Sequence, residues 1–213
     1  MSEPNASANG DLKIILASSS PRRIQLLQNL SLQFEIKPAD IDETVPPGLS
    51  PPQIVCELAR QKGEKILSTL SLSQLGRYLI IAADTLVARD DQVLGKPIDR
   101  QDAVKMLMSL SNRSHSVYTG VHLILTAHNL GEPHQSRTFF GDTKVVVRSL
   151  QLKEVEAYVA TGEPDDKAGA YALQGIGAFL IDHIEGCPAN VIGLPVPLLV
   201  KELRDMGLRV MGL

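Results

Sequence analysis

Strand-like and helix-like stretches follow one another along the body of this chain, and few fold classes accommodate that order. The apolar run from Tyr78 to Val87 is the strongest strand pattern. Arg100 to Leu110 has the spacing of an amphipathic helix with one apolar stripe. Alternation of this kind is typical of a sheet packed against helices. We therefore predict the α/β class, with a mixed, partly antiparallel sheet flanked by helices.

Caps, chain breakers and hydrophobic periodicity predict the remaining elements. Ser50 as the cap and Pro51 as the first helical residue begin one of the helices. The other predicted helices are 21–30, 152–160 and 195–206, and the helix after Ser50 ends near residue 67. The other predicted strands are 13–17, 34–37, 93–94, 115–125, 138–148, 175–184 and 190–192.

The length and the even composition favour one continuous fold. The chain has 213 residues, with no internal repeat and no low-complexity linker in its body. We predict a single domain over residues 12–213, with room for two lobes, and a disordered tail over residues 1–11. The tail lacks the apolar segment of a signal peptide, and no apolar run approaches the ~20 residues of a membrane span. These features predict a cytoplasmic protein with no membrane partner.

The net charge limits the class of ligand. At −3, it argues against a nucleic-acid polymer as partner, because a nucleic-acid-binding face needs a surplus of cations. A small anionic ligand fits, since a few Lys and Arg side chains in one cleft outweigh the overall sign.

The segment LASSSPRR, from Leu16 to Arg23, has the pattern of an anion site. A strand, a serine-rich loop and a helix start follow one another, and free N–H groups at a helix start attract anions. Ser18 adds a hydroxyl group, and Arg22 and Arg23 add planar cations suited to phosphate. Helical spacing places Arg23 on the apolar side and Arg22 about 100° away. The alternative is an ordinary capped helix with two solvated arginines.

Asp84 interrupts the apolar run from Tyr78 to Val87. An unpaired carboxylate is costly to bury, so Asp84 is expected to meet a cation or to belong to a site. Carboxylates beside phosphates also recruit Mg²⁺. The alternative is an aspartate that ends a strand and bonds to a turn. Thr85, next to it, donates a hydrogen bond to a ligand or fills a strand position.

Further polar candidates stand on loops and at a helix edge. Lys96 lies in a rigid Gly-Lys-Pro turn, and Lys62 lies at the edge of the buried face of its helix. Gln174 lies in the long segment 162–175, where its amide can read a base edge. Solvated surface positions are the alternative for all three residues. Glu43, in an acidic pair with its neighbour, is uninformative alone.

Several site classes find no support in the sequence. No two of the five histidines have metal-ligand spacing, and neither a GxxxxGK[ST] loop nor a GxGxxG fingerprint is present. The residues by themselves therefore indicate an anion or nucleotide site and go no further.

Eight short motifs occur in the order seen in Maf-like proteins, and the chain resembles that family from about Lys13 to Leu208. The motifs are LASSSPRR, IDE (41–43), ARQK (59–62), AADT (82–85), LGKP (94–97), YTGV (118–121), GEPDDKAGAYALQG (162–175) and NVIGLP (190–195). The resemblance implies a two-lobed fold similar to that of inosine triphosphatases, with a central cleft. It also implies hydrolysis of nucleoside triphosphates to monophosphate and pyrophosphate, and a homodimer.

The resemblance is strongest to the branch of the family that acts on dTTP and UTP. That branch carries the residue types found here as Arg22, Thr85 and Gln174, whereas the branch acting on 7-methyl-GTP typically has Trp, Gln and Glu. Modified pyrimidine nucleotides are further candidate substrates. Ala82 and Ala172 stand where Gly is usual, and their methyl groups are expected to narrow the pocket or shift the nucleotide preference.

The resemblance also implies roles for individual residues. Asp84 matches the general base or metal-bound carboxylate, and Ser18 and Arg23 match the phosphate-binding groups. The other catalytic charges are Glu43, Lys62 and Lys96. Glu43 and Asp84 are expected to hold Mg²⁺ or Mn²⁺ while water attacks the α-phosphorus. Two alternatives remain, a nucleotide sensor without catalysis and a regulatory protein of cell division.

Overall fold

The computed structural model describes residues 12–70, 77–90, 92–127 and 132–210, so the predicted disordered tail over residues 1–11 lies outside the described residues. The strands are β1 (Leu12–Leu16), β2 (Glu35–Ile36), β3 (Arg77–Arg89), β4 (Gln92–Leu94), β5 (Ser114–Leu125), β6 (Gln135–Val147) and β7 (Ile181–Glu185). The α-helices are α1 (Pro21–Gln28), α2 (Pro51–Ser68), α3 (Arg100–Leu110), α4 (Leu152–Ala160), α5 (Pro188–Ile192) and α6 (Val196–Asp205). No helix in the described ranges is both long enough and apolar enough to cross a membrane.

The strands form one mixed sheet, which confirms the predicted class. Its order is β2-β1-β3-β5-β6-β7, and β4 pairs with β3. β1 is parallel to both of its neighbours, whereas β3, β5, β6 and β7 follow one another antiparallel. The parallel strands need a crossover between them, and α2 supplies it between β2 and β3.

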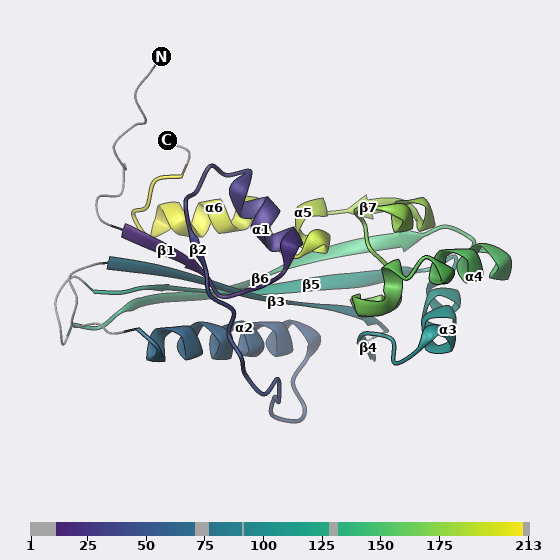
Figure 1. Cartoon of the computed structure of the whole chain (residues 1–213), viewed down its shortest axis with the longest axis horizontal. Coiled ribbons are helices and arrows are strands. Elements are labelled where there is room, and N and C mark those ends of the chain that lie inside the picture. The colour runs from purple at the N-terminus through teal and green to yellow at the C-terminus, as the bar shows by residue number, and fades with distance from the viewer. Residues whose placement is uncertain (1–11, 71–76, 91, 128–131, 211–213) are drawn as a thin grey trace, which may run out of the picture.

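Helices cover both faces of one half of the sheet (Figure 1). On one face, Ile15 and Ile80 pack with Ile66 of α2. On the other face, residues one position along the same strands pack with Leu27 of α1 and with Leu199 of α6. This division follows from the alternation of side chains along a strand. Both faces are buried, which explains why Tyr78 to Val87 is apolar almost throughout.

The other half of the sheet has its own core, so the fold has two lobes that share β3, β5 and β6. Val87, Val117 and Val145, from these three strands, pack there with α3 and α4. Figure 1 shows α3 and α4 beyond the end of α2, where they cover the far part of the sheet. Asp84 lies in β3 between the two lobes.

Two strand predictions near the C-terminus are wrong. Residues 190–192 belong to the short helix α5, which begins at Pro188 and ends before Gly193, at a φ of 133°. Asn190 is fully buried there, and its side-chain amide donates to the backbone oxygen of Val117. Residues 175–184 form a strand only in their second half, because a 3-10 turn at Ile176–Leu180 precedes β7. Apolar runs as short as these do not separate a strand from a helical turn.

Candidate functional site

A cavity of about 980 Å³ opens between the two lobes. β1 ends at Leu16, which pairs with Ile81, and β3 continues past this point. The end of β1 therefore exposes the next part of β3, and the start of α1 lies beside it. The nine residues predicted for the site all line this cavity: Ser18, Arg22, Arg23, Glu43, Lys62, Asp84, Thr85, Lys96 and Gln174.

Asp84 and Thr85 face opposite sides of the sheet. Side chains two positions apart on a strand point to the same face. Asp84 lies two positions after Ala82, which packs on the side of α2, and Thr85 lies two positions after Ala83, which packs on the side of α1 and α6. The cavity wraps around the end of β1 and reaches both side chains. One strand therefore presents a carboxylate on one side and a hydroxyl group on the other.

On the α2 side, Lys62 joins two carboxylates. Its Nζ lies 2.6 Å from Asp84 Oδ1 and 2.7 Å from Glu43 Oε1. The Lys62 and Asp84 side chains are only 12% and 15% exposed, whereas Glu43 is 59% exposed. The hydrogen bond from Lys62 lowers the pKa of the Glu43 carboxyl group. The prediction that Asp84 meets a cation is thus confirmed, and the alternative of a turn-bonded aspartate is wrong.

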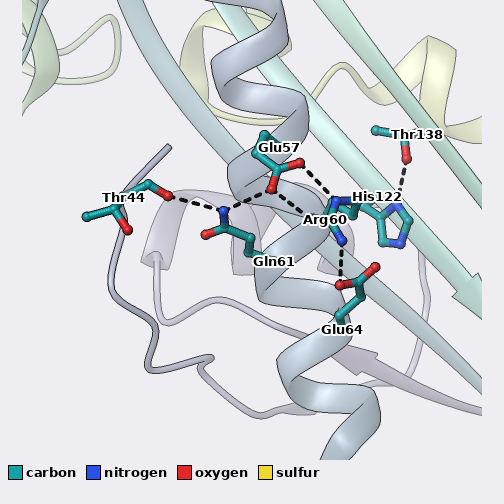
Figure 2. A network of polar contacts seen from close by, with 7 residues as sticks. All are labelled: Thr44, Glu57, Arg60, Gln61, Glu64, His122 and Thr138. Carbon is teal, nitrogen blue, oxygen red and sulfur yellow. Dashed lines mark hydrogen bonds and ion pairs between the residues drawn. The ribbon is translucent and has the colours of Figure 1, made fainter. Parts of the chain in front are cut away.

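The loop that carries Glu43 is tied to the outer face of α2 (Figure 2). Gln61 Nε2 donates to the backbone oxygen of Thr44 at 3.2 Å and to Glu57 Oε1 at 2.9 Å. Arg60 holds the Glu57 carboxylate through two bonds of 2.9 and 2.6 Å. These bonds hold the pKa of Glu57 at about 2, so Glu57 stays charged at neutral pH. Two consecutive residues of α2 thus serve different ends, since Gln61 fixes the loop and Lys62 enters the cavity.

On the α1 side, Arg23 is held by three protein acceptors. Its Nε donates to the backbone oxygen of Gly193 at 2.8 Å, Nη1 to Ser18 Oγ at 3.3 Å and Nη2 to Thr85 Oγ1 at 2.9 Å. Burial lowers the pKa of the Arg23 guanidinium, and the negative charge of Asp84 opposes that shift. Ser20 and Pro21 begin α1 as predicted, although the Ser20 side chain makes no capping bond.

The other predicted residues stand around the rim of the cavity. Lys96 and Gln174 are exposed, and Arg22 is partly buried. The charge of Lys96 helps to lower the pKa of Glu43. The hydrogen bond from Lys167 lowers the pKa of Asp166, and the charge of Arg22 adds to that shift. Neither Lys96 nor Gln174 has a hydrogen bond or an ion pair within the described ranges, so both are available to a ligand.

Of the two alanines that replace glycine, only Ala172 lines the cavity. Ala82 is fully buried and packs against the α2 side of the sheet. The expectation of a narrower pocket therefore applies to Ala172 and not to Ala82.

The segment that carries Gln174 is anchored by the half-buried carboxylate of Glu163. Glu163 accepts hydrogen bonds from the Tyr158 hydroxyl at 2.9 Å, from Gly177 N at 2.8 Å and from Ile176 N at 3.0 Å. Tyr158 precedes the segment 162–175, and the two amides follow it. Glu163 therefore joins the two ends of the segment and closes it into a compact loop. Gln174 lies two residues before the first of these amides.

Tyr171, in the same segment, forms a buried pair with His115 of β5. His115 Nε2 lies 2.7 Å from the Tyr171 hydroxyl, and the rings meet edge to face with centroids 5.4 Å apart. His115 Nδ1 is buried and has no hydrogen-bond partner in the described part of the chain. Burial lowers the pKa of His115 to about 4, from an ordinary value of 6.5. Tyr171 itself lines the cavity, so this pair supports its floor.

We expect the neutral state of His115 to make stability fall in acid. Below pH 6.5 the unfolded chain takes up a proton at His115, and the folded protein does not until about pH 4. The free energy of unfolding should therefore fall by up to about 1.4 kcal/mol per pH unit in that interval. Denaturant unfolding of wild type and His115→Gln at a series of pH values measures this contribution. The same pH slope in both proteins would contradict it.

The residues present fit a divalent cation. Glu43 and Asp84 already share one positive charge, since both carboxylates contact the Lys62 ammonium group. Within the described residues, no three His, Cys, Asp or Glu side chains are grouped to hold a metal. Mg²⁺ commonly binds through one or two carboxylates together with substrate phosphates, so a pair of carboxylates is sufficient when a nucleotide is present.

Several residues of the site were not assigned a role from the sequence. The Thr119 hydroxyl oxygen lies 2.9 Å from Thr85 Oγ1, within hydrogen-bond distance. The Thr119 hydroxyl group also donates to the backbone oxygen of Asn190. Glu163, Asp166 and Lys167 line the cavity, and the Asp166 and Lys167 side chains pair with each other. The sequence does carry a signal for the helix that holds Asn190, because Pro188 is typical of a helix start and Gly193 of a helix end.

Comparison with known proteins agrees with the motif order. Residues 13–206 match the family described as Maf-like protein. A "dTTP/UTP pyrophosphatase" of Acetivibrio thermocellus is 44% identical over 94% of this chain and 98% of its own length. A protein of the same name from Carboxydothermus hydrogenoformans is 43% identical over 92% of this chain and 100% of its own length. Among solved structures, a HAM1 protein from Coxiella burnetii is 17% identical, with a TM-score of 0.47 over 92% of this chain and 98% of that chain.

The cavity has cations on both sides of a half-buried carboxylate, an arrangement that suits a polyanionic ligand. The chain belongs to the Maf-like family.

Proposed function

We propose that this protein is a nucleoside triphosphate pyrophosphatase that converts dTTP and UTP to the monophosphate and pyrophosphate. The observation that carries the proposal is that one cavity holds Asp84, bonded to Lys62, and the next residue, Thr85, bonded to Arg23. Relatives more than 40% identical, which carry the name "dTTP/UTP pyrophosphatase", support the reaction and the substrate.

Asp84 is the general base of the proposed reaction. Only Oδ1 of its carboxylate is bonded to Lys62, so the second oxygen is available to take a proton from water. The water oxygen attacks the α-phosphorus, the bond from that phosphorus to the bridging oxygen breaks, and pyrophosphate leaves. The bond from Lys62, 2.6 Å long, fixes the direction of the Asp84 carboxylate. A general base placed in this way contributes about 10²–10⁴-fold to a rate.

The cations of the cavity stabilise the charge that builds up on the phosphates. Arg23 and Ser18 lie on the α1 side, Lys62 lies on the α2 side, and Lys96 stands at the rim. Arg23 is held in place before the substrate arrives, which is the condition for strong electrostatic stabilisation. Glu43 and Asp84 are the residues that would hold Mg²⁺ or Mn²⁺, which supplies positive charge to the triphosphate.

Arg22, Thr85 and Gln174 set the nucleotide preference in this proposal. Gln174 is exposed at the rim, on the loop closed by Glu163, and its amide offers both a donor and an acceptor to a base. The proposal includes modified pyrimidine nucleotides as candidate substrates. By resemblance to the family, the proposal extends to a homodimer in the cytoplasm, with residues 12–213 forming one domain of two lobes. Its partner is a nucleotide and neither a nucleic-acid polymer nor a membrane.

Release of pyrophosphate from a panel of nucleotides tests the proposal. The panel is dTTP, UTP, CTP, GTP, ATP and 7-methyl-GTP, each with Mg²⁺ or Mn²⁺. We expect dTTP and UTP to be cleaved fastest, with the monophosphate as the second product. Faster cleavage of another nucleotide would keep the reaction and overturn the roles of Arg22, Thr85 and Gln174. Binding without any release by the folded protein would identify a nucleotide sensor instead.

A further inference from the structure

A series of hydrogen bonds leads from the cavity into the core. Arg23 Nη2 donates to Thr85 Oγ1 at 2.9 Å, and Thr85 Oγ1 lies 2.9 Å from Thr119 Oγ1. Thr119 Oγ1 lies 2.9 Å from the backbone oxygen of Asn190. Thr85 and Thr119 are paired across β3 and β5, and both Thr119 and Asn190 are fully buried. The four groups thus connect the two central strands with α1 and α5.

The chemistry of these groups fixes the direction of every bond. A backbone oxygen only accepts, so the single hydroxyl proton of Thr119 goes to Asn190. Thr119 then has no proton for Thr85, and Thr85 must donate to Thr119. The guanidinium only donates, so Thr85 accepts from Arg23. The proton of Thr85 is therefore committed to the core and is not available to a ligand.

The same bonds fix the orientation of Arg23. Its three nitrogens each donate once to the protein, to Gly193, Ser18 and Thr85. A guanidinium has five N–H groups, so one N–H remains on each terminal nitrogen, without a partner in the described part of the chain. These two groups are what Arg23 offers to a phosphate.

We propose that Thr119, with the backbone oxygen of Asn190, is a positioning residue that turns the Thr85 hydroxyl into an acceptor for Arg23. Thr85 then does not donate to a phosphate oxygen, and it acts on the nucleotide through Arg23. This inference corrects the expectation that Thr85 donates to a ligand. It rests on the proposed function only for the identity of the nucleotide.

The first test compares the hydroxyl-deleted and hydroxyl-retaining variants Thr119→Val and Thr119→Ser. With dTTP or UTP, Thr119→Val is expected to lower kcat/KM about tenfold, the effect of one hydrogen bond, and Thr119→Ser to stay within about twofold of wild type. In a Thr85→Val background, Thr119→Val is expected to add nothing, because the two residues act through one chain of bonds. Unchanged activity of Thr119→Val, or effects that multiply in the double variant, would overturn the inference.

A second readout does not depend on catalysis. In wild type the NMR signals of the Arg23 guanidinium N–H groups should exchange slowly with water, and Thr119→Val should speed that exchange. The matched control is Thr126→Val, which removes another buried hydroxyl group, one that accepts from Tyr78 N away from the cavity. The control should leave the Arg23 signals unchanged. Arg23 signals that do not respond to Thr119→Val would refute the positioning role.

The two readouts separate this inference from the proposed function. If wild type releases no pyrophosphate but the Arg23 signals respond to Thr119→Val, the proposed function is wrong and the positioning role of Thr119 holds. If wild type is active and the signals do not respond, only the positioning role is wrong. Should Thr119→Val not fold, the NMR signal of the Thr85 hydroxyl proton in wild type decides the question, and we expect this proton to exchange slowly with water. A nuclear Overhauser contact with Thr119 supports the inference, and rapid exchange with water contradicts it.

Discussion

Asp84→Asn is expected to lower the turnover of dTTP and UTP by about 10³-fold. The amide cannot take a proton from the attacking water, although it has nearly the shape of the carboxylate. Lys62 keeps Glu43 as a partner at 2.7 Å, so its charge stays paired in the variant. The protein should therefore fold and bind nucleotide. Steady-state pyrophosphate release, with circular dichroism as the check on folding, measures the effect.

The matched control is Asp142→Asn, which removes the charge of an exposed aspartate on β6 outside the cavity. We expect turnover within about twofold of wild type, since surface substitutions away from a site have small effects. Near-normal turnover of folded Asp84→Asn would remove Asp84 from the role of general base. An equal loss in both variants would show that the effect is not specific to the cavity.

The sequence predicts most of the fold because apolar periodicity and caps are local signals. α3 and α4 have the predicted bounds, and the hydrophobic run of β3 is buried on both faces as expected. Local signals fail where an element is short. α5 has five residues, and its sequence reads as well as a strand. Its buried polar side chain, Asn190, follows from tertiary contacts that periodicity does not carry.

The sequence predicts in part which residues form the site, but it does not predict which of them contact one another. Asp84 is conspicuous because a carboxylate in an apolar run needs a cation, but the run does not say that Lys62 supplies it. Arg23 meets Gly193 across 170 positions of sequence, and Thr85 meets Thr119 across 34. Such pairings depend on the register of β3 against β5 and on where α5 returns to the sheet. Neither is encoded within a window of neighbouring residues.

Gly120 shows how the register of β3 against β5 affects the position of a site residue. It pairs directly with Asp84 across β3 and β5, and α2 crosses the sheet at this point. A Cβ atom at Gly120 would lie 2.3 Å from the backbone oxygen of Val55 and 2.6 Å from Cys56 N. The absence of a side chain therefore lets the backbone of α2 rest against β5. Lys62 lies on the same helix two turns later, and this close approach brings its ammonium group to Asp84.

Gly120→Ala is accordingly expected to lower the free energy of unfolding by about 3 kcal/mol. The new methyl group meets backbone atoms, which cannot move aside as a flexible side chain does. The matched control is Gly95→Ala, where an added Cβ meets nothing within 4 Å, and there we expect a change within about 0.5 kcal/mol. Denaturant unfolding of both variants measures the difference.

The same substitution should also lower pyrophosphate release by the folded fraction, because any shift of α2 away from β5 moves Lys62 from Asp84. Stability and activity are then linked through one helix position, and a variant that loses stability elsewhere should not lose activity in the same way. Leu110→Ala provides that comparison, since Leu110 is buried in the core of the other lobe and is not among the residues that line the cavity. If Gly120→Ala unfolds as easily as expected but its folded fraction turns over normally, the Lys62–Asp84 contact does not depend on the position of α2. If the variant is as stable as wild type, α2 does not rest on β5 at Gly120, and the packing that joins the helix to the site must be revised.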